Sequence, residues 1–451
     1  METGSSVPDL GKAHQALPAR PSRLERLAWA SLDFANSGYT TVVLTAVFNA
    51  YFVSVVMGGS PQATLVWTSI LAVSYAVVMI TAPWIGALAD ARACKKSILF
   101  IATIGCSLST LALGLVGPGD LWLAAVLLLI SNVAYATHQD VSAGFLRELA
   151  SRDQTGRLSG YGWAWGYLGG LLSLVLSLTW FLKGAQWLGL PLTEQEKVMG
   201  SLAATAVLFA GVGITALVLL KERSPPTGEP WRLAWHRLVG GWHDITMDSS
   251  AQSLRRFLWC VLAYQAGVAT VIALAAIYAQ QVMGFGMDKT VLLILVVNLT
   301  ASVGAALFGW LQDRVGHGRS LGLALWLWIG MVACAGLGQT EGWFWLAANL
   351  AGLAMGASQS GARAAVADLA PAHRQAEAFG YWGVAVNGAS VLGPLAYGLV
   401  TWLTDNDHRL AIGLTGLFFV AGLFLLRRVQ WPGPAGSSGS SGASGTSGTT
   451  D

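Results

Sequence analysis

The chain has 451 residues, of which 54% are hydrophobic and 11% are charged, and its mean hydropathy is +0.57. So few charged residues cannot cover the surface of a soluble globule of this size. The formal net charge of +3 is spread over short loops rather than gathered into a patch with interleaved aromatic residues, which argues against a nucleic-acid partner. The lipid bilayer is therefore the expected solvent of an integral, multi-pass membrane protein.

Apolar runs that can cross about 30 Å of hydrocarbon as helices recur along the whole chain. They lie at 28–56, 64–89, 97–116, 121–146, 158–182, 198–220, 257–283, 290–312, 320–338, 343–364, 376–403 and 410–428. We predict an all-α membrane protein with twelve transmembrane helices in two pseudo-symmetric six-helix bundles.

Three polar segments divide the chain into domains. Residues 1–26 form a tail without the apolar core of a signal peptide. Between bundles at 27–220 and 255–430, the linker 221–254 carries Trp231, Trp235 and Trp242 at helical spacing. This pattern predicts an amphipathic helix in the membrane interface, which is either a plain anchor, the favoured interpretation, or a partner site. Residues 431–451 are rich in Gly, Ser and Thr and are predicted to be disordered.

The basic residues of the loops indicate an orientation. If the twelve spans hold, only Lys183, Lys197, Lys289 and Arg409 lie opposite the many other lysines and arginines of the loops. By the positive-inside rule, both termini are then cytoplasmic. A bacterial inner (cytoplasmic) membrane is the expected location.

The two halves carry an internal repeat. A shift of 220 residues aligns Glu148-Leu149-Ala150 with Asp368-Leu369-Ala370, Gly160-Tyr161 with Gly380-Tyr381, and Gln139 with Gln359. At a shift of 223, Gly86 and Asp90 of one loop motif align with Gly309 and Asp313 of another, and a basic residue follows each aspartate, at Arg92 and Arg314. Duplicated bundles of this kind are typical of secondary transporters.

In repeat-built transporters the substrate lies near the membrane midplane between the halves. Ionisable side chains are costly there unless they are paired or hydrated. The ionisable candidates are Asp33, His138, Asp140 and Arg363, and the uncharged ones are Asn36, Gln139, Asn298, Gln359 and Asn387. We predict that they form one cavity for a small-molecule substrate.

The ionisable candidates have alternative roles. Asp33 either takes part in transport or caps a neighbouring helix. Asp140 and His138 are two residues apart and face different sides of one helix, so we place Asp140 in the cavity and interpret His138 as a core residue rather than a proton relay. Arg363 either binds a substrate carboxylate or pairs with Asp33 or Asp140. Coupling to protons through Asp33 or Asp140 is one option.

Residues at the helix junctions form a second group. Carboxylates there can accept hydrogen bonds from helix N-terminal amides or pair with arginines of the other half, which holds one side of the membrane closed until the halves move. The gate candidates are Gly86, Asp90, Arg92, Arg147, Glu148, Gly309, Asp313, Arg314, Asp368, Arg374 and Glu377.

Motifs for enzymatic chemistry are absent from the sequence. It contains no GxxxxGK[ST] phosphate loop and no HExxH pair. The four cysteines, Cys94, Cys106, Cys260 and Cys334, have no CxxC spacing. We therefore predict no catalytic residue, no cofactor and no metal site, and transport that runs on gradients.

Further motifs carry a family resemblance. They are Asp33-Phe-Ala-Asn36-Ser37-Gly-Tyr39, Arg157-Leu-Ser159-Gly160-Tyr-Gly162, Gly166-Tyr167-Leu-Gly169-Gly170, Gln359 with Arg363, and Gly380 with Gly393-Pro394. With the paired loop motifs, region 27–428 resembles the "unknown major facilitator" branch of the major facilitator superfamily, which includes the fungal vacuolar amino-acid effluxer linked to autophagy. The resemblance implies the major facilitator fold, a single working chain, and export of amino acids by alternating access.

The chain departs from that branch in its seventh apolar run. Where the branch would show Tyr-x-Asp-Gly, this sequence has Tyr264-Gln265-Ala266-Gly267, so Asp140 is the alternative source of a carboxylate. Two further functions stay open: a transport-inactive membrane scaffold or sensor, which the missing carboxylate favours, and a multidrug exporter.

Overall fold

The computed structural model describes residues 21–179, 189, 192–226, 249–281, 283–338, 340–405 and 407–431. The first twenty residues, the predicted Trp-rich linker helix, Lys183 and the tail from 432 onward lie outside these residues. Within them, the regular structure is entirely helical.

The first half begins with one long helix that changes its winding. α1 (Arg23–Tyr39) continues through the π-helical η1 (Thr40–Ala46), α2 (Val47–Tyr51) and the π-helical η2 (Phe52–Val56). The helices that follow are α3 (Ala63–Arg92), α4 (Lys95–Leu113), α5 (Leu121–Ala143), the short α6 (Leu146–Leu149), α7 (Thr155–Leu176) and α9 (Glu194–Leu219). Side chains fix two of the starts: Ser22 caps α1, and a capping box of Thr193 and Glu196 begins α9.

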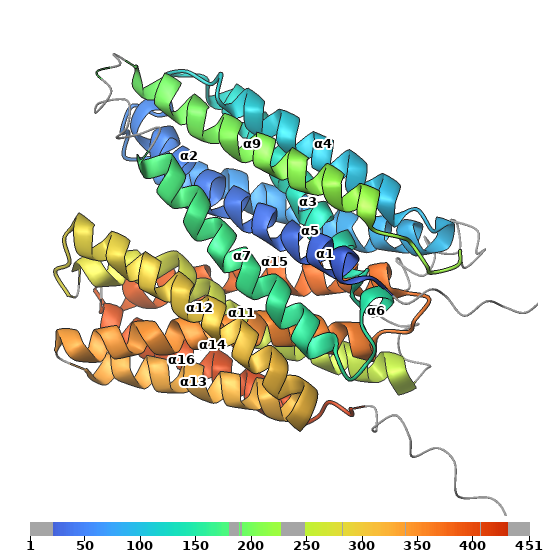
Figure 1. The fold of residues 1–451 in the computed structure, drawn as a ribbon. Coiled ribbons are helices and arrows are strands. Elements are labelled where there is room, and N and C mark those ends of the chain that lie inside the picture. The colour runs from blue at the N-terminus through green and yellow to red at the C-terminus, as the bar shows by residue number, and fades with distance from the viewer. Residues whose placement is uncertain are drawn as a thin grey trace, which may run out of the picture.

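The second half contains six long helices. They are α11 (Ser249–Gln281), α12 (Met287–Val315), α13 (His317–Leu337), α14 (Glu341–Leu369), α15 (Gln375–Leu403) and α16 (His408–Leu426). Figure 1 shows the two halves as two groups of helices, blue to green for the first and yellow to red for the second.

Eleven helices of the described chain are long and apolar enough to span a membrane. α14 is 29 residues long but is not among them, and its stretch Gly356-Ala-Ser-Gln-Ser-Gly-Ala-Arg363 is rich in small and polar residues. With α14, all twelve predicted spans correspond to helices, whose ends differ from the prediction by a few residues. The deviation is largest at α11, which begins at Ser249 rather than at 257.

The two halves meet through α3 and α15, and through α7, α12 and α14. Close backbone contacts between them involve Gly86 with Ala376, and Gly160 with Gly309. They lie near the junctions of α3 with α4, α5 with α7, α12 with α13, and α14 with α15. We call this the gated end of the molecule; in Figure 1 it is the end at which α6 lies.

Glycines at the gated end allow helix backbones of the two halves to touch. A Cβ atom on Gly309 would lie 2.6 Å from the carbonyl oxygen of Gly156 and 2.8 Å from Cα of Gly160. A Cβ atom on Gly380 would lie 2.5 Å from the carbonyl oxygen of Ala82. Backbone atoms cannot move aside as flexible side chains do, so the repeated glycines set the distance between the halves.

We expect Gly309→Ala to destabilise this arrangement by about 1–3 kcal/mol, the usual cost of overpacking, and to lower the midpoint of thermal unfolding in detergent. Gly398→Ala in α15 is the matched control, because no atom lies within 4 Å of a Cβ atom built there. Equal midpoints for the two variants would show that the close contact between the halves contributes nothing to stability.

Candidate functional site

An ion pair between the two halves lies beside the gated end. Nη1 of Arg363, on α14, is 2.8 Å from Oδ1 and 2.7 Å from Oδ2 of Asp33, on α1. Both residues are buried, with exposed fractions of 2% and 7%. Arg363 also donates from Nε to Oγ of Ser159 at 3.0 Å and from Nη2 to the Ser159 carbonyl oxygen at 2.9 Å. One guanidinium of the second half is thus bound by α1 and α7 of the first.

Aromatic rings and a glycine complete the surroundings of this pair. The guanidinium carbon of Arg363 lies 4.7 Å from the ring centre of Trp29 and 5.5 Å from that of Trp163. A Cβ atom on Gly162 would lie 2.7 Å from Nη2 of Arg363 and would also collide with the Asp33 carboxylate. The pair is therefore dehydrated and held between indoles, which strengthens its mutual attraction.

Asp140 forms a different contact between the halves. Its carboxyl group, on α5, lies against Gly383 of α15: a Cβ atom on Gly383 would be 3.0 Å from Cγ and 3.2 Å from Oδ1 of Asp140. Asp140 is buried, and its Oδ2 has no hydrogen-bond partner among the described residues. An isolated carboxylate is costly in such a place, so the neutral acid is the form that fits this conformation.

His138 faces the interior of the first half instead. Its ring lies 4.8 Å from the ring of Phe209, on α9, and neither ring nitrogen has a hydrogen-bond partner in the described chain. The two-residue spacing to Asp140 thus separates the side chains as the helix geometry requires.

The uncharged candidates are only partly brought together. Asn36 is buried one turn from Asp33, and neither amide atom has a partner within the described ranges. Gln359 exchanges hydrogen bonds with Gln265 of α11, at 2.7 and 3.5 Å. Gln139 accepts from the hydroxyl of Tyr135 on its own helix. Asn298 and Asn387 donate to carbonyl oxygens four residues earlier in their own helices, and so belong to no shared cluster.

Sequence reasoning missed four participants in the site. Trp29, Trp163 and Ser159 surround Arg363, and Gln265 binds Gln359. The spacing of four residues from Trp29 to Asp33 is a signal that was present, because it puts both on one face of a helix. The contacts of Ser159 and Gln265 join helices far apart in the sequence, so no local pattern reveals them.

At the gated end, each half caps a helix of the other. Asp313 of α12 accepts hydrogen bonds from the backbone amides of Gly156, at 2.8 Å, and Arg157, at 3.0 Å, in the first turn of α7. Asp90 of α3 accepts from the amide of Glu377, at 2.9 Å, in the first turn of α15. Carboxylates at helix N-termini satisfy free amides and complement the helix dipole. The reciprocal arrangement joins the halves at two equivalent points.

Asp368 joins the halves at a third point. Its carboxylate lies 3.3 Å from Nη1 of Arg147, accepts from the hydroxyl of Thr155 at 3.0 Å, and is 2.7 Å from Nε2 of His317. Arg147 and Thr155 belong to the first half, whereas His317 begins α13 of the second.

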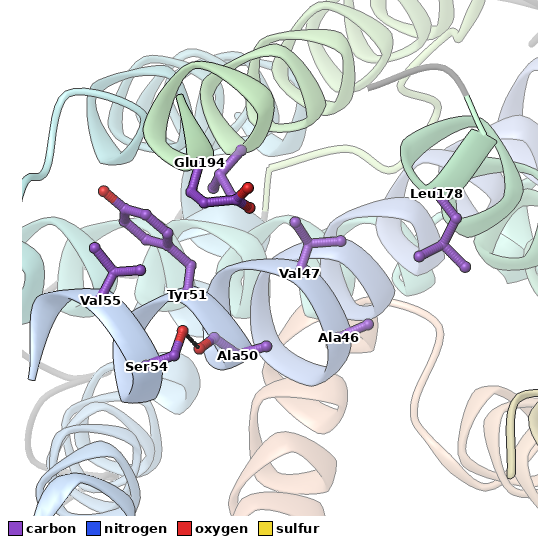
Figure 2. Close-up of a pocket in the computed structure, with 9 residues that line it drawn as sticks. Ala46, Val47, Ala50, Tyr51, Ser54, Val55, Leu178 and Glu194 are labelled. Carbon is purple, nitrogen blue, oxygen red and sulfur yellow. Dashed lines mark hydrogen bonds between the residues drawn. The ribbon is translucent and has the colours of Figure 1, made fainter. Parts of the chain in front are cut away.

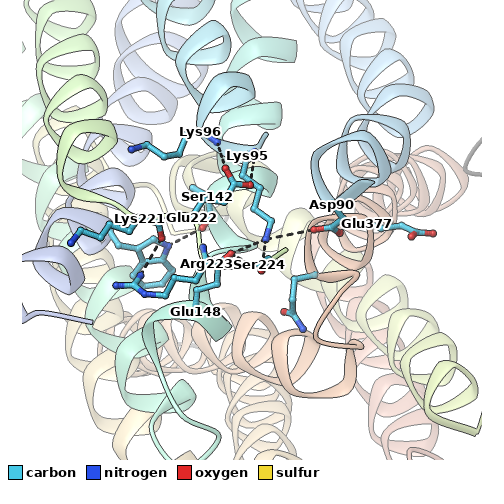
Figure 3. Close-up of polar contacts among 12 residues, drawn as sticks. Asp90, Lys95, Lys96, Ser142, Glu148, Lys221, Glu222, Arg223, Ser224 and Glu377 are labelled. Atoms are coloured by element: carbon cyan, nitrogen blue, oxygen red, sulfur yellow. Dashed lines mark hydrogen bonds and ion pairs between the residues drawn. The ribbon is translucent and has the colours of Figure 1, made fainter. Parts of the chain in front are cut away.

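Glu148, the counterpart of Asp368 in the repeat, binds residues of its own half instead. Figure 3 shows Nζ of Lys95 between Glu148, at 2.8 Å, and Asp90, at 3.6 Å. Glu148 also accepts from the amide of Arg223 and from the hydroxyl of Ser224, at the start of the linker. The side chain of Arg223 forms two hydrogen bonds with Glu25 of α1, which raises the pKa of the guanidinium.

The other gate candidates lie at the ends of these helices. Gly86 and Gly309 form the close backbone contacts, and Glu377 contributes its backbone amide. Arg374 precedes α15 as its N-cap residue. Arg92 lies in the last turn of α3, and Arg314 stacks on Trp310 of its own helix at 3.6 Å.

A cavity of about 300 Å³ lies elsewhere, between η1, α2, η2, α9 and Leu178, which follows α7. Figure 2 shows its lining, in which Tyr51, Ser54 and Glu194 are the polar residues and the others are small or apolar. None of the predicted site residues lines it. Among the described residues, no group of three or more His, Cys, Asp or Glu side chains could hold a metal ion.

Known proteins match the chain over most of its length. The profile of the family described as "Vacuole effluxer Atg22 like" matches residues 53–432. A protein of Bacillus subtilis (strain 168), the "Uncharacterized MFS-type transporter YxiO", is 26% identical over 410 residues, which are 88% of this chain and 93% of the relative.

Solved structures share the fold. The human organic anion transporter MFSD10 (TETRAN) is 16% identical, with a TM-score of 0.69 over 90% of this chain and 99% of that one. The Escherichia coli fucose:proton symporter FucP is 12% identical, with a TM-score of 0.71 over 92% of this chain and 100% of that one. These likenesses confirm the predicted all-α, two-bundle major facilitator fold.

The reciprocal capping generates a prediction for the gate. We expect Asp313→Asn to shift the equilibrium toward an open gated end by about 1–2 kcal/mol, because the neutral amide loses two charge-assisted bonds to α7 and the interaction with its dipole. Nitroxide labels on Ser151→Cys and Ala372→Cys, in exposed loops of the two halves, report the distance by pulsed electron paramagnetic resonance after the native cysteines are replaced with alanine.

The matched control is Asp120→Asn. Asp120 accepts a hydrogen bond from the amide of Gly117 at 2.9 Å within one half, so its neutralisation should leave the label distance unchanged. Identical distance distributions for Asp313→Asn and the unsubstituted label pair would refute a gating role for the cap.

Proposed function

This chain belongs to the Atg22-like vacuole effluxer family and is a membrane transporter of the major facilitator superfamily, and we propose that it is a secondary transporter of small zwitterionic metabolites. Amino acids are the proposed substrate class, and export is the proposed direction. The family resemblance derived from the sequence is thereby confirmed, and the chain is a transporter rather than an enzyme.

The observation that carries the proposal is the buried pair of Asp33 and Arg363. These residues offer one negative and one positive group, 2.7 Å apart, from opposite halves. Removing one partner would leave an unpaired buried charge, at a cost of about 3–5 kcal/mol. A zwitterion avoids this cost because its carboxylate can bind Arg363 while its ammonium group binds Asp33. Such a substrate would replace the ion pair between Asp33 and Arg363 with one ion pair from each residue to the substrate.

Alternating access follows if the halves then part at the gated end. The loops there carry most of the chain's basic residues, so we assign that end to the cytoplasm by the positive-inside rule. The conformation described here would then be closed toward the cytoplasm. Both halves contribute a carboxylate to the caps at the gated end, as a gate between two moving bundles requires, and this favours transport over the scaffold alternative.

Asp140 is the proposed proton carrier. In this conformation its carboxyl group contacts Gly383 and no cation of the described chain. When α5 and α15 move apart, water can reach the group and stabilise its charged form. Proton release would thereby be tied to opening of the gated end.

The first test is counterflow of a labelled amino-acid panel in proteoliposomes. We expect Asp33→Asn and Arg363→Ala each to reduce saturable flux by at least about tenfold, because each leaves one buried charge unpaired. Lys289→Ala is the matched control: Lys289 forms an exposed ion pair with Glu341 at 2.9 Å within the second half, and exposed pairs contribute little.

Control-like flux in both variants, or no flux of any amino acid through folded native protein, would overturn the proposed substrate class. The multidrug alternative would instead show competition by unrelated organic cations.

The second test separates proton coupling from substrate movement. With an imposed pH gradient, native protein should accumulate substrate, whereas Asp140→Asn should catalyse counterflow without accumulation, because an amide cannot release a proton. Accumulation by Asp140→Asn at the native level would exclude Asp140 as the carrier.

A further inference from the structure

The two halves differ in chemistry at one equivalent position of the gate. Lys95 begins α4 of the first half, and His317 begins α13 of the second. Lys95 binds Glu148 at 2.8 Å, and His317 binds Asp368 at 2.7 Å. Glu148 and Asp368 are themselves counterparts in the repeat. A lysine stays charged over the physiological range, whereas the charge of an imidazole changes between about pH 5 and 8.

A neighbouring glutamine identifies the form of His317 that fits the closed gate. Nε2 of Gln312, on α12, lies 2.6 Å from Nδ1 of His317 and donates to the carbonyl oxygen of Gly361, on α14, at 2.9 Å. Reversing the amide would turn Oε1 toward that carbonyl oxygen, so the bond to Gly361 fixes a donor against Nδ1. Nδ1 must therefore accept, and Nε2–H donates to Asp368. His317 is neutral here and ties α12, α13 and α14 together.

Protonation of His317 would disturb this arrangement. A hydrogen on Nδ1 would face the amide hydrogens of Gln312, so the bond to Gln312 breaks or the amide turns and loses Gly361. The first half has no such conflict, because Ala89 occupies the position equivalent to Gln312.

A charged imidazole at His317 would also act on the charged groups around it. Asp368 already binds Arg147 of α6, and its attraction to an imidazolium would oppose part of the disturbance. Asp313, next to Gln312 on α12, caps α7 beside Arg157 and is near enough to attract a charged imidazole at His317. A cation at His317 would compete with the α7 amides for Asp313. The ring of Trp431, after α16, covers His317 at 5.6 Å and carries no charge.

We propose that His317 is a proton-binding site of the gate, separate from the substrate pair, and that its protonation opens the gated end. The neutral imidazole completes the closed gate through Gln312 and Asp368, and the imidazolium weakens both the α12 junction and the Asp313 cap. This inference rests on the proposed alternating access, so its test measures conformation and not flux.

The experiment uses the full chain in nanodiscs with the label pair at Ser151→Cys and Ala372→Cys, measured by pulsed electron paramagnetic resonance at about pH 8 and about pH 5.5, on either side of imidazole titration. Acidification should raise the ratio of open to closed molecules about fivefold, the factor that corresponds to one lost hydrogen bond. Adding the amino-acid panel at pH 8 tests the proposed function in the same sample, because substrate should open the gate without acid.

Two variants isolate the imidazole from the nearby carboxyl groups. His317→Gln cannot take up the proton, and Gln312→Ala removes the donor that opposes it, so the pH response should be smaller in both than in the native chain. A response that remains in both variants comes from the carboxyl groups of the gate. Each variant is compared with itself at the two pH values, which cancels any constant effect on the gate. A native chain without a pH response, or an undiminished response in His317→Gln or Gln312→Ala, would overturn the proposal.

Discussion

In a bilayer, an arginine that leaves its carboxylate partner must find another partner or water, and this constraint applies to Asp33 and Arg363. The pair lies between indole rings with almost no solvent exposure, and its two members belong to different halves of the chain. The halves cannot separate without breaking this pair, whose mutual attraction is strong because burial keeps it in a low dielectric. We propose that the pair opposes opening until a ligand supplies both opposite charges, which would link substrate binding to movement.

The other contacts that hold the two halves together at the gated end are individually weaker and occur in both repeats. Asp313 and Asp90 each cap a helix of the opposite half, and glycines let the backbones approach closely enough for these caps to form. The repeat is exact neither in sequence nor in contacts: Asp368 reaches across to Arg147, whereas Glu148 holds the start of the linker. Opening would consequently disrupt different contacts in the two halves, and the proposed proton site at His317 belongs to only one of them.

The sequence predicted the helices well because hydrophobic length is the main requirement for crossing a bilayer. The repeated aspartates of the loops lie at helix junctions, where the sequence left two contacts open, a helix cap or a pair with an arginine. The structure places the carboxylates of Asp90 and Asp313 on helix amides. Which residues contact each other in the site was harder to predict from the sequence. Whether Arg363 binds Asp33 or Asp140 depends on the rotation of α1 and α5 in the bundle, and the contact of Gln359 with Gln265 depends on how α11 and α14 pack. The spacing of residues along the sequence determines neither the rotation of these helices nor their packing.

The central claim is that a zwitterion replaces the Asp33–Arg363 pair, and calorimetric binding to the native protein in nanodiscs tests it most directly. The ligands are the amino acid of the panel with the largest flux, the carboxylic acid that lacks its amino group, and the amine that lacks its carboxylate. The account predicts heat of binding for the amino acid, lost in Arg363→Ala, and no saturable binding of either singly charged analogue. Equal affinity of one analogue and the amino acid would contradict it, because a single charge would then suffice to separate the pair.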